Sequence, residues 1–136
     1  MYKKILIPID GSEQSTEAAL QGAELAQIIG ATVTLFHVVP VLPVDRIRSI
    51  VIDEIKVQGK EILKQAEQDI AKFEVPVDTD MVPGHPADAI VLKARLEEYD
   101  LIIMGSKGLG AVKIYLLGSV SSTVSKHAHC SVLIVR

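Results

Sequence analysis

Aromatic residues and cysteine are scarce in this chain of 136 residues, which has no tryptophan, two phenylalanines, three tyrosines and one cysteine. A single cysteine excludes an intramolecular disulfide and a zinc cluster built from several thiolates. Few aromatics, a net charge of -3 and the lack of any long basic block argue against nucleic acid as the main partner. A small anion stays compatible with this composition, because backbone amides bind anions without net positive charge.

Long hydrophobic runs are also missing. No apolar stretch approaches the ~18 consecutive residues that a membrane span needs, and the N-terminal segment 1–5 lacks the plan of a signal peptide. We therefore expect a soluble, cytoplasmic protein with no membrane partner. The length fits one domain, residues 1–136, which can bury about two thirds of its unfolded surface. Cys130, beside a run of valines and leucines, is expected to be half-buried and inert rather than a reactive thiol.

Short β-like runs alternate with longer helix-like stretches along the chain. That alternation is typical of an α/β fold in which helices cover a parallel sheet. Runs of Ile, Val and Leu without strict alternation suit strands that are buried on both faces. Five strands are expected, at residues 4–9, 32–39, 75–82, 101–104 and 131–135.

Helix signals fill the gaps between these strands. The first helix should begin after Ser12 as N-cap, end at Gly30 and pack on the sheet through Ala19, Ala23 and Ala26. The second spans residues 45–73, with an apolar stripe of three- and four-residue spacing. Gly59 lies on that stripe and marks either close packing or a kink. The remaining helices are expected to open at His85, followed by Pro86, and at Ser119, the latter running to about His127.

Pro8 marks the end of the first strand. Proline has no amide hydrogen for a sheet, so a central strand must be losing its pairing there. Ligands of open parallel sheets sit outside the carboxyl ends of the strands, where the strand order reverses. The residues that end the first, second and fourth strands are therefore site candidates: Ile9, Asp10, Val38, Val39, Met104 and Gly105.

A glycine and serine pattern near the C-terminus predicts a phosphate site. Gly105-Ser106-Lys107-Gly108 is followed by nine residues and then by Gly118-Ser119-Val120-Ser121. A strand that ends at Gly105, glycines that allow close backbone approach and a helix that begins at Ser119 would direct free amides at an anion. The alternative is that the glycines form only a tight turn and that Ser119 is only an N-cap.

The chain resembles the universal stress protein family over essentially its whole length. The resemblance rests on residues 7–12, 35–39, 84–88 with Ile90, and 100–105, leading into Gly105, Gly108, Gly118 and Ser119. The glycine pattern is similar to that of the ATP-binding branch. The resemblance implies a single-domain, open, doubly wound five-stranded parallel sheet in the order 3-2-1-4-5 with helices on both faces. Such a fold is Rossmann-like, of the adenine nucleotide alpha hydrolase-like type, and the resemblance further implies a homodimer.

The same resemblance implies a nucleotide-binding role for eleven positions. Pro8, Ile9 and Asp10 match the segment that contacts adenosine, Val38 the position whose backbone meets adenine, and Met104 and Gly105 positions that line the nucleotide. Gly108, Gly118, Ser119, Val120 and Ser121 match the positions that wrap the phosphates. Asp10 is suited to accept hydrogen bonds from ribose hydroxyls, but it is equally suited to bind amides of the first helix. Ser131 stands where the family commonly has proline.

The leading functional hypothesis is an ATP-binding, dimeric regulatory module in stress response, read by an unidentified protein partner. A Mg²⁺ or Mn²⁺ ion is expected to arrive with the nucleotide, and no metal ligands and no catalytic residues are assigned. The alternative is a slow ATP hydrolase or phosphotransferase, against which stands the lack of a Walker motif. His37 is expected to be a hydrogen-bonded core residue. The last strand, Ser131 to Arg136, should form an exposed edge that a second chain covers.

Overall fold

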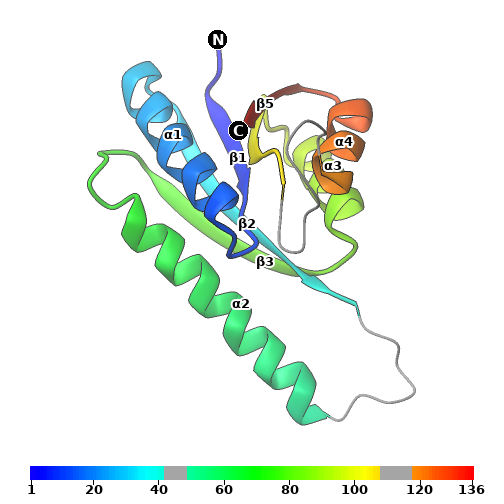
Figure 1. Ribbon diagram of the computed structural model, residues 1–136. Coiled ribbons are helices and arrows are strands. Elements are labelled where there is room, and N and C mark those ends of the chain that lie inside the picture. The colour runs from blue at the N-terminus through cyan, green and yellow to red at the C-terminus, as the bar shows by residue number, and fades with distance from the viewer. Residues whose placement is uncertain (42–48, 108–117) are drawn as a thin grey trace.

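The computed structural model describes residues 1–41, 49–107 and 118–136. Helices and strands alternate along this part of the chain (Figure 1), in the order β1 (Lys4–Pro8), α1 (Glu13–Ile29), β2 (Thr32–Pro40), α2 (Ser49–Asp69), β3 (Val77–Gly84), α3 (Pro86–Leu96), β4 (Leu101–Gly105), α4 (Ser119–His127) and β5 (Ser131–Val135). The strands form one five-stranded parallel sheet in the order β3-β2-β1-β4-β5. The predicted doubly wound α/β fold and its strand order are confirmed.

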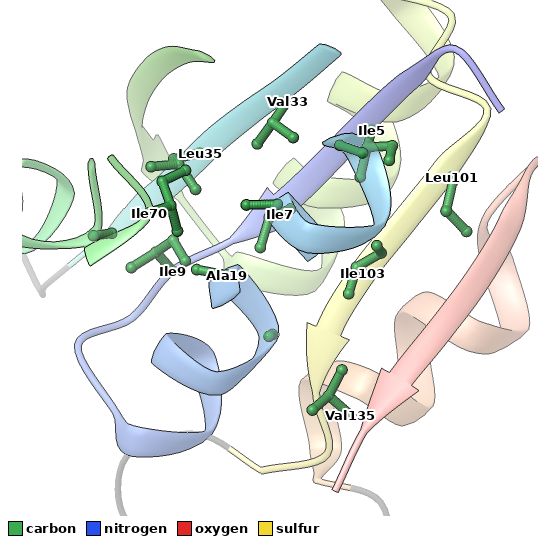
Figure 2. Packing of buried hydrophobic residues seen from close by; sticks show 14 of the residues in the cluster. Ile5, Ile7, Ile9, Ala19, Val33, Leu35, Ile70, Leu101, Ile103 and Val135 are labelled. Atoms are coloured by element: carbon green, nitrogen blue, oxygen red, sulfur yellow. The ribbon is translucent and has the colours of Figure 1, made fainter. Parts of the chain in front are cut away.

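The helices cover both faces of the sheet. Figure 1 shows α1 and α2 on one side and α3 and α4 on the other. Each face has its own core cluster, because successive side chains of a strand point to opposite faces. Ile5 and Ile7 of β1 belong to the cluster under α1 and α2 (Figure 2), whereas Leu6 belongs to the cluster under α3 and α4.

Most predicted boundaries hold within one or two residues. β5 begins and ends where expected, β1 ends at Pro8, one residue before its predicted end, and β3 lies two residues later than predicted, at Val77–Gly84. No helix in the described part of the chain is both long and apolar enough to cross a membrane.

Helix α1 follows its sequence signals closely. Ser12 is the N-cap and accepts a hydrogen bond from Ser15 N, and Gly30 ends the helix at φ 75°, a left-handed conformation that suits glycine. The predicted alanine stripe is fully buried: Ala19, Ala23 and Ala26. These small side chains let the helix lie close to the sheet.

The predicted stripe of α2 is only partly correct. The expected start of this helix, residues 45–48, lies outside the described residues. From Gly59 onward the helix packs on the sheet through Leu63 and Ala66, and Ile70, directly after the helix, is buried as well, but Val51 and its neighbours in the first turns are exposed. Gly59 serves close packing within an uninterrupted helix, because a Cβ there would lie 2.6 Å from Met81 Sδ.

A lysine whose side chain is only 9% exposed fixes α3 against the sheet. The amine of Lys93 lies 2.7 Å from Asp80 Oδ2 and 2.6 Å from Glu97 Oε2, and it lies over the rings of Phe36 and Tyr99. Burial lowers the pKa of Lys93, but the hydrogen bonds to Asp80 and Glu97 outweigh that effect and raise the net pKa above the ordinary 10.5. The charged amine therefore favours the folded state.

Replacing Lys93 by methionine should lower the free energy of unfolding by about 1–2 kcal/mol near neutral pH, because two half-exposed carboxylates lose their cation. Denaturant unfolding of both proteins measures this difference. The matched control is Lys64→Met, at an exposed lysine of α2 without an ion pair among the described residues, which should change stability by less than about 0.5 kcal/mol.

The same pair of proteins tests the pKa direction. Because the pKa of Lys93 is raised in the folded state, its contribution is complete below the ordinary lysine pKa and is lost as pH rises through the raised value. The stability gap between the parent and the Lys93→Met variant should therefore narrow only above about pH 10.5. A gap that already closes between about pH 7 and about pH 9 would contradict this assignment.

Candidate nucleotide site

The sheet has a switch point between β1 and β4. From β1 the chain passes through α1 to β2, whereas β4, on the other side of β1, is flanked in sequence by α3 and α4 on the opposite face. All strands are parallel, so their carboxyl ends lie at one edge of the sheet. Such a switch point is where open α/β sheets bind ligands.

The end of β1 is fixed by a series of short hydrogen bonds. Ile9 N donates to Phe36 O at 2.8 Å, and Ile9 O accepts from His37 Nδ1 at 2.7 Å. Asp10 Oδ1 then accepts from Ser12 N at 2.9 Å and from Ser12 Oγ at 2.5 Å. The carboxylate thus joins the end of β1 to the start of α1, which is the structural role predicted as one alternative for Asp10.

Ser106 joins β4, β5 and α4 directly after the fourth strand. Its amide donates to Val135 O at 2.9 Å, and its carbonyl accepts from Gly118 N at 2.6 Å and from Ser121 Oγ at 2.9 Å. The start of α4 is thereby held against the end of β4. This places Gly118 and the helix that follows it at the same edge as the ends of β1 and β2.

The first turn of α4 carries amides that have no hydrogen-bond partner in the described part of the chain. Gly118 is the N-cap and provides no side-chain hydrogen bond, and the first amide to bond within the helix is Ser122 N, which donates to Gly118 O at 2.9 Å. The amides of Ser119, Val120 and Ser121 therefore have no hydrogen-bond acceptor among the described residues. Together with the positive end of the helix dipole, they form a site suited to an anion.

Several candidate residues can offer only backbone groups to a ligand. The side chains of Ile9, Val38 and Met104 are buried in the two core clusters, with 4–8% exposure. Ser121 is also buried, and its hydroxyl donates to Ser106 O and Gly118 O. Ser119 is exposed at the helix start, and Pro8 is half-buried as the last residue of β1.

The candidate glycines have packing roles as well. A Cβ on Gly105 would lie 2.8 Å from Gln14 Cβ, and a Cβ on Gly118 would lie 3.0 Å from Ser106 O. Both glycines therefore permit close contacts within the fold, and this packing role is separate from any close approach of a ligand. Gly108 and the rest of 108–117 lie outside the described residues.

Two residues at this edge were not assigned a role in the site from sequence. In the sequence, Ser106 is only one member of the glycine pattern, although its position directly after a strand is a signal for a junction. His37 was predicted to be a hydrogen-bonded core residue, and its 7% exposure and its bond to Ile9 O confirm this. No sequence pattern indicates that its partner is the carbonyl of a candidate site residue.

Comparisons with known proteins agree with this geometry. The model of the universal stress protein family matches residues 1–136. Universal stress protein MJ0531 of Methanocaldococcus jannaschii is 38% identical over 141 residues, which cover all of this chain and 83% of that protein. The structure of universal stress protein UspA from Lactobacillus plantarum superposes with a TM-score of 0.87 at 26% identity, covering 99% of this chain and 98% of that one. A universal stress protein solved in complex with cAMP gives a TM-score of 0.80 at 25% identity, over 99% and 97% of the two chains. The chain therefore belongs to the universal stress protein family.

Proposed function

We propose that this protein is an ATP-binding regulatory module in stress response, whose nucleotide state is read by a protein partner. The observation that carries the proposal is the row of amides at the start of α4 that find no acceptor among residues 1–41, 49–107 and 118–136, held by Ser106 at the edge where β1 and β4 end. A related protein at 25% identity has been solved with cAMP, which also joins an adenine base to a phosphate. That relationship supports an adenine nucleotide as the ligand.

Each part of the nucleotide has a matching group in the proposal. The phosphates bind the amides of Ser119, Val120 and Ser121, where the helix dipole favours negative charge. The sugar lies near Asp10, since a carboxylate accepts hydrogen bonds from hydroxyls but repels phosphate. The base lies at the end of β2, against the backbone of Val38. A Mg²⁺ or Mn²⁺ ion accompanies the triphosphate.

We also propose that two copies of the chain pair through β5. β5 is the last strand of the sheet that the described residues form, and Leu133 is 43% exposed. Because Ser106 N donates to Val135 O, alternate residues Val132 and Ile134 direct their peptide groups away from β4. Those groups and Leu133 form an edge that a second β5 would cover. Val135, expected at the exposed edge, lies instead in the core with 4% exposure (Figure 2).

Replacing Ser119 by aspartate should weaken ATP binding at least tenfold, about 1.4 kcal/mol, measured by calorimetry. The added carboxylate would lie where we place the phosphates, yet an acidic residue in a first helical turn stabilises the helix. Ser119→Asn is the matched control, because asparagine has the shape of aspartate but no charge. This variant should bind ATP within about threefold of the parent. Equal ATP affinity for the Asp and Asn variants, both folded, would refute the phosphate site.

Replacing Leu133 by lysine should convert a dimer into a monomer, as measured by light scattering at micromolar concentration, because two charged side chains would face each other across the β5 edges. Leu96→Lys is the control: this leucine of α3 is 69% exposed but distant in sequence from β5. The control should stay dimeric. A parent protein that is monomeric at this concentration would rule out the β5 dimer.

A further inference from the structure

The Ile9 carbonyl is bonded to a side chain where a parallel sheet would normally supply an amide. Ile9 N donates to Phe36 O, so Ile9 continues the pairing of β1 with β2 by one bond beyond Pro8. In a regular parallel pair the Ile9 carbonyl would then accept from the amide two residues further along β2, which is Val38 N. It accepts instead from His37 Nδ1 at 2.7 Å. Hydrogen bonding between β1 and β2 therefore ends with the bond from Ile9 N to Phe36 O, and no bond joins Val38 N to Ile9 O among the described residues.

The consequence is an available peptide group on Val38. Alternate residues of a parallel strand direct both peptide groups toward the same neighbour, and the bond to Phe36 O identifies β1 as the neighbour for Phe36 and Val38. Beyond Pro8 there is no β1 residue opposite Val38 in the register. The Val38 N–H and C=O therefore point to the space past the end of β1, with the Val38 side chain held in the core on the α3–α4 face.

His37 is held in the orientation that this bond requires. A carbonyl can only accept, so Nδ1 carries the proton and donates. The opposite side of the ring faces α2: a Cβ on Gly59 would lie 2.9 Å from His37 Cδ2 and 3.3 Å from His37 Nε2. Met81 Sδ lies beside the same glycine. The ring is thus enclosed between the Ile9 carbonyl and the glycine of the helix, and it is 7% exposed.

We propose that His37 is a positioning residue for base recognition. Because its ring donates a hydrogen bond to the Ile9 carbonyl, the Val38 peptide does not pair with β1 and stays available to the hydrogen-bonding edge of the adenine. The inference rests on the proposed ATP binding. His37 itself does not touch the nucleotide in this arrangement. It acts on the base and not on the phosphates, which bind at α4 on the other side of β1.

Two substitutions of equal shape at His37 separate the effect of its hydrogen-bond donor from the effect of its side-chain volume. Asparagine places an amide nitrogen at the same number of bonds from Cβ as Nδ1 of histidine, whereas leucine has the same branched shape without a donor. His37→Asn should bind ATP within about threefold of the parent, and His37→Leu at least tenfold more weakly. Inorganic tripolyphosphate, which has no base, should bind the parent and both variants within about twofold. Calorimetry measures all of these affinities.

The outcomes distinguish the inference from the proposed function. A folded His37→Leu protein that binds ATP as tightly as the parent, or that loses ATP and tripolyphosphate equally, overturns the role of His37. A parent protein that binds neither ligand overturns the proposed function.

A measurement without ligand tests the same point if the leucine variant does not fold. Amide hydrogen exchange in the nucleotide-free parent should be at least tenfold faster at Val38 than at Phe36, since the Phe36 amide lies within the regular pairing of β1 and β2. Adding ATP should slow exchange at Val38. Equal protection of Val38 and Phe36 in the nucleotide-free protein overturns the inference.

Discussion

The central strand β1 ends at Pro8, whose peptide group faces β4 and has no amide hydrogen to donate, while its other neighbour β2 continues to Pro40. In the register, Pro8 lies opposite Phe36, so the last four residues of β2 extend past the end of β1. The rest of the edge depends on this early end. Because of it, the Ile9 carbonyl accepts a hydrogen bond from His37, and Asp10 lies in the turn that begins α1. Val38 has no β1 residue opposite it in the register.

The glycines of the candidate site illustrate how packing and binding require the same residue. Gly105 lets the first turn of α1 lie against β4, and Gly118 lets the start of α4 lie against Ser106. A larger residue at either position would separate the elements whose ends form the edge. Replacing these glycines therefore tests the fold and the ligand together, whereas Ser119 is exposed and can be changed with less effect on packing.

Backbone groups dominate the proposed site, and this has a physical cause. At the ends of buried strands the side chains of Ile9, Val38 and Met104 are needed in the core, so the groups that remain for a ligand are peptide N–H and C=O. Helix α4 adds amides that its own geometry leaves unpaired. The side chains then act mainly by fixing that backbone, as Ser106, Asp10 and His37 do through the bonds described above.

The sequence alone determined the fold class, the limits of most elements and the edge of the sheet where the candidate site lies. Periodicity, the cap at Ser12, Gly30 and the position of Pro8 are local signals, and local backbone chemistry decides them. Only the tertiary structure decided the rest, because it depends on contacts between residues distant in sequence. His37 meets Ile9 across 28 residues, and Gly59 of α2 fits against His37 and Met81. The exposure of the first turns of α2 and the burial of Val135 likewise follow from how far each element overlaps the sheet, which no periodic pattern within one segment encodes.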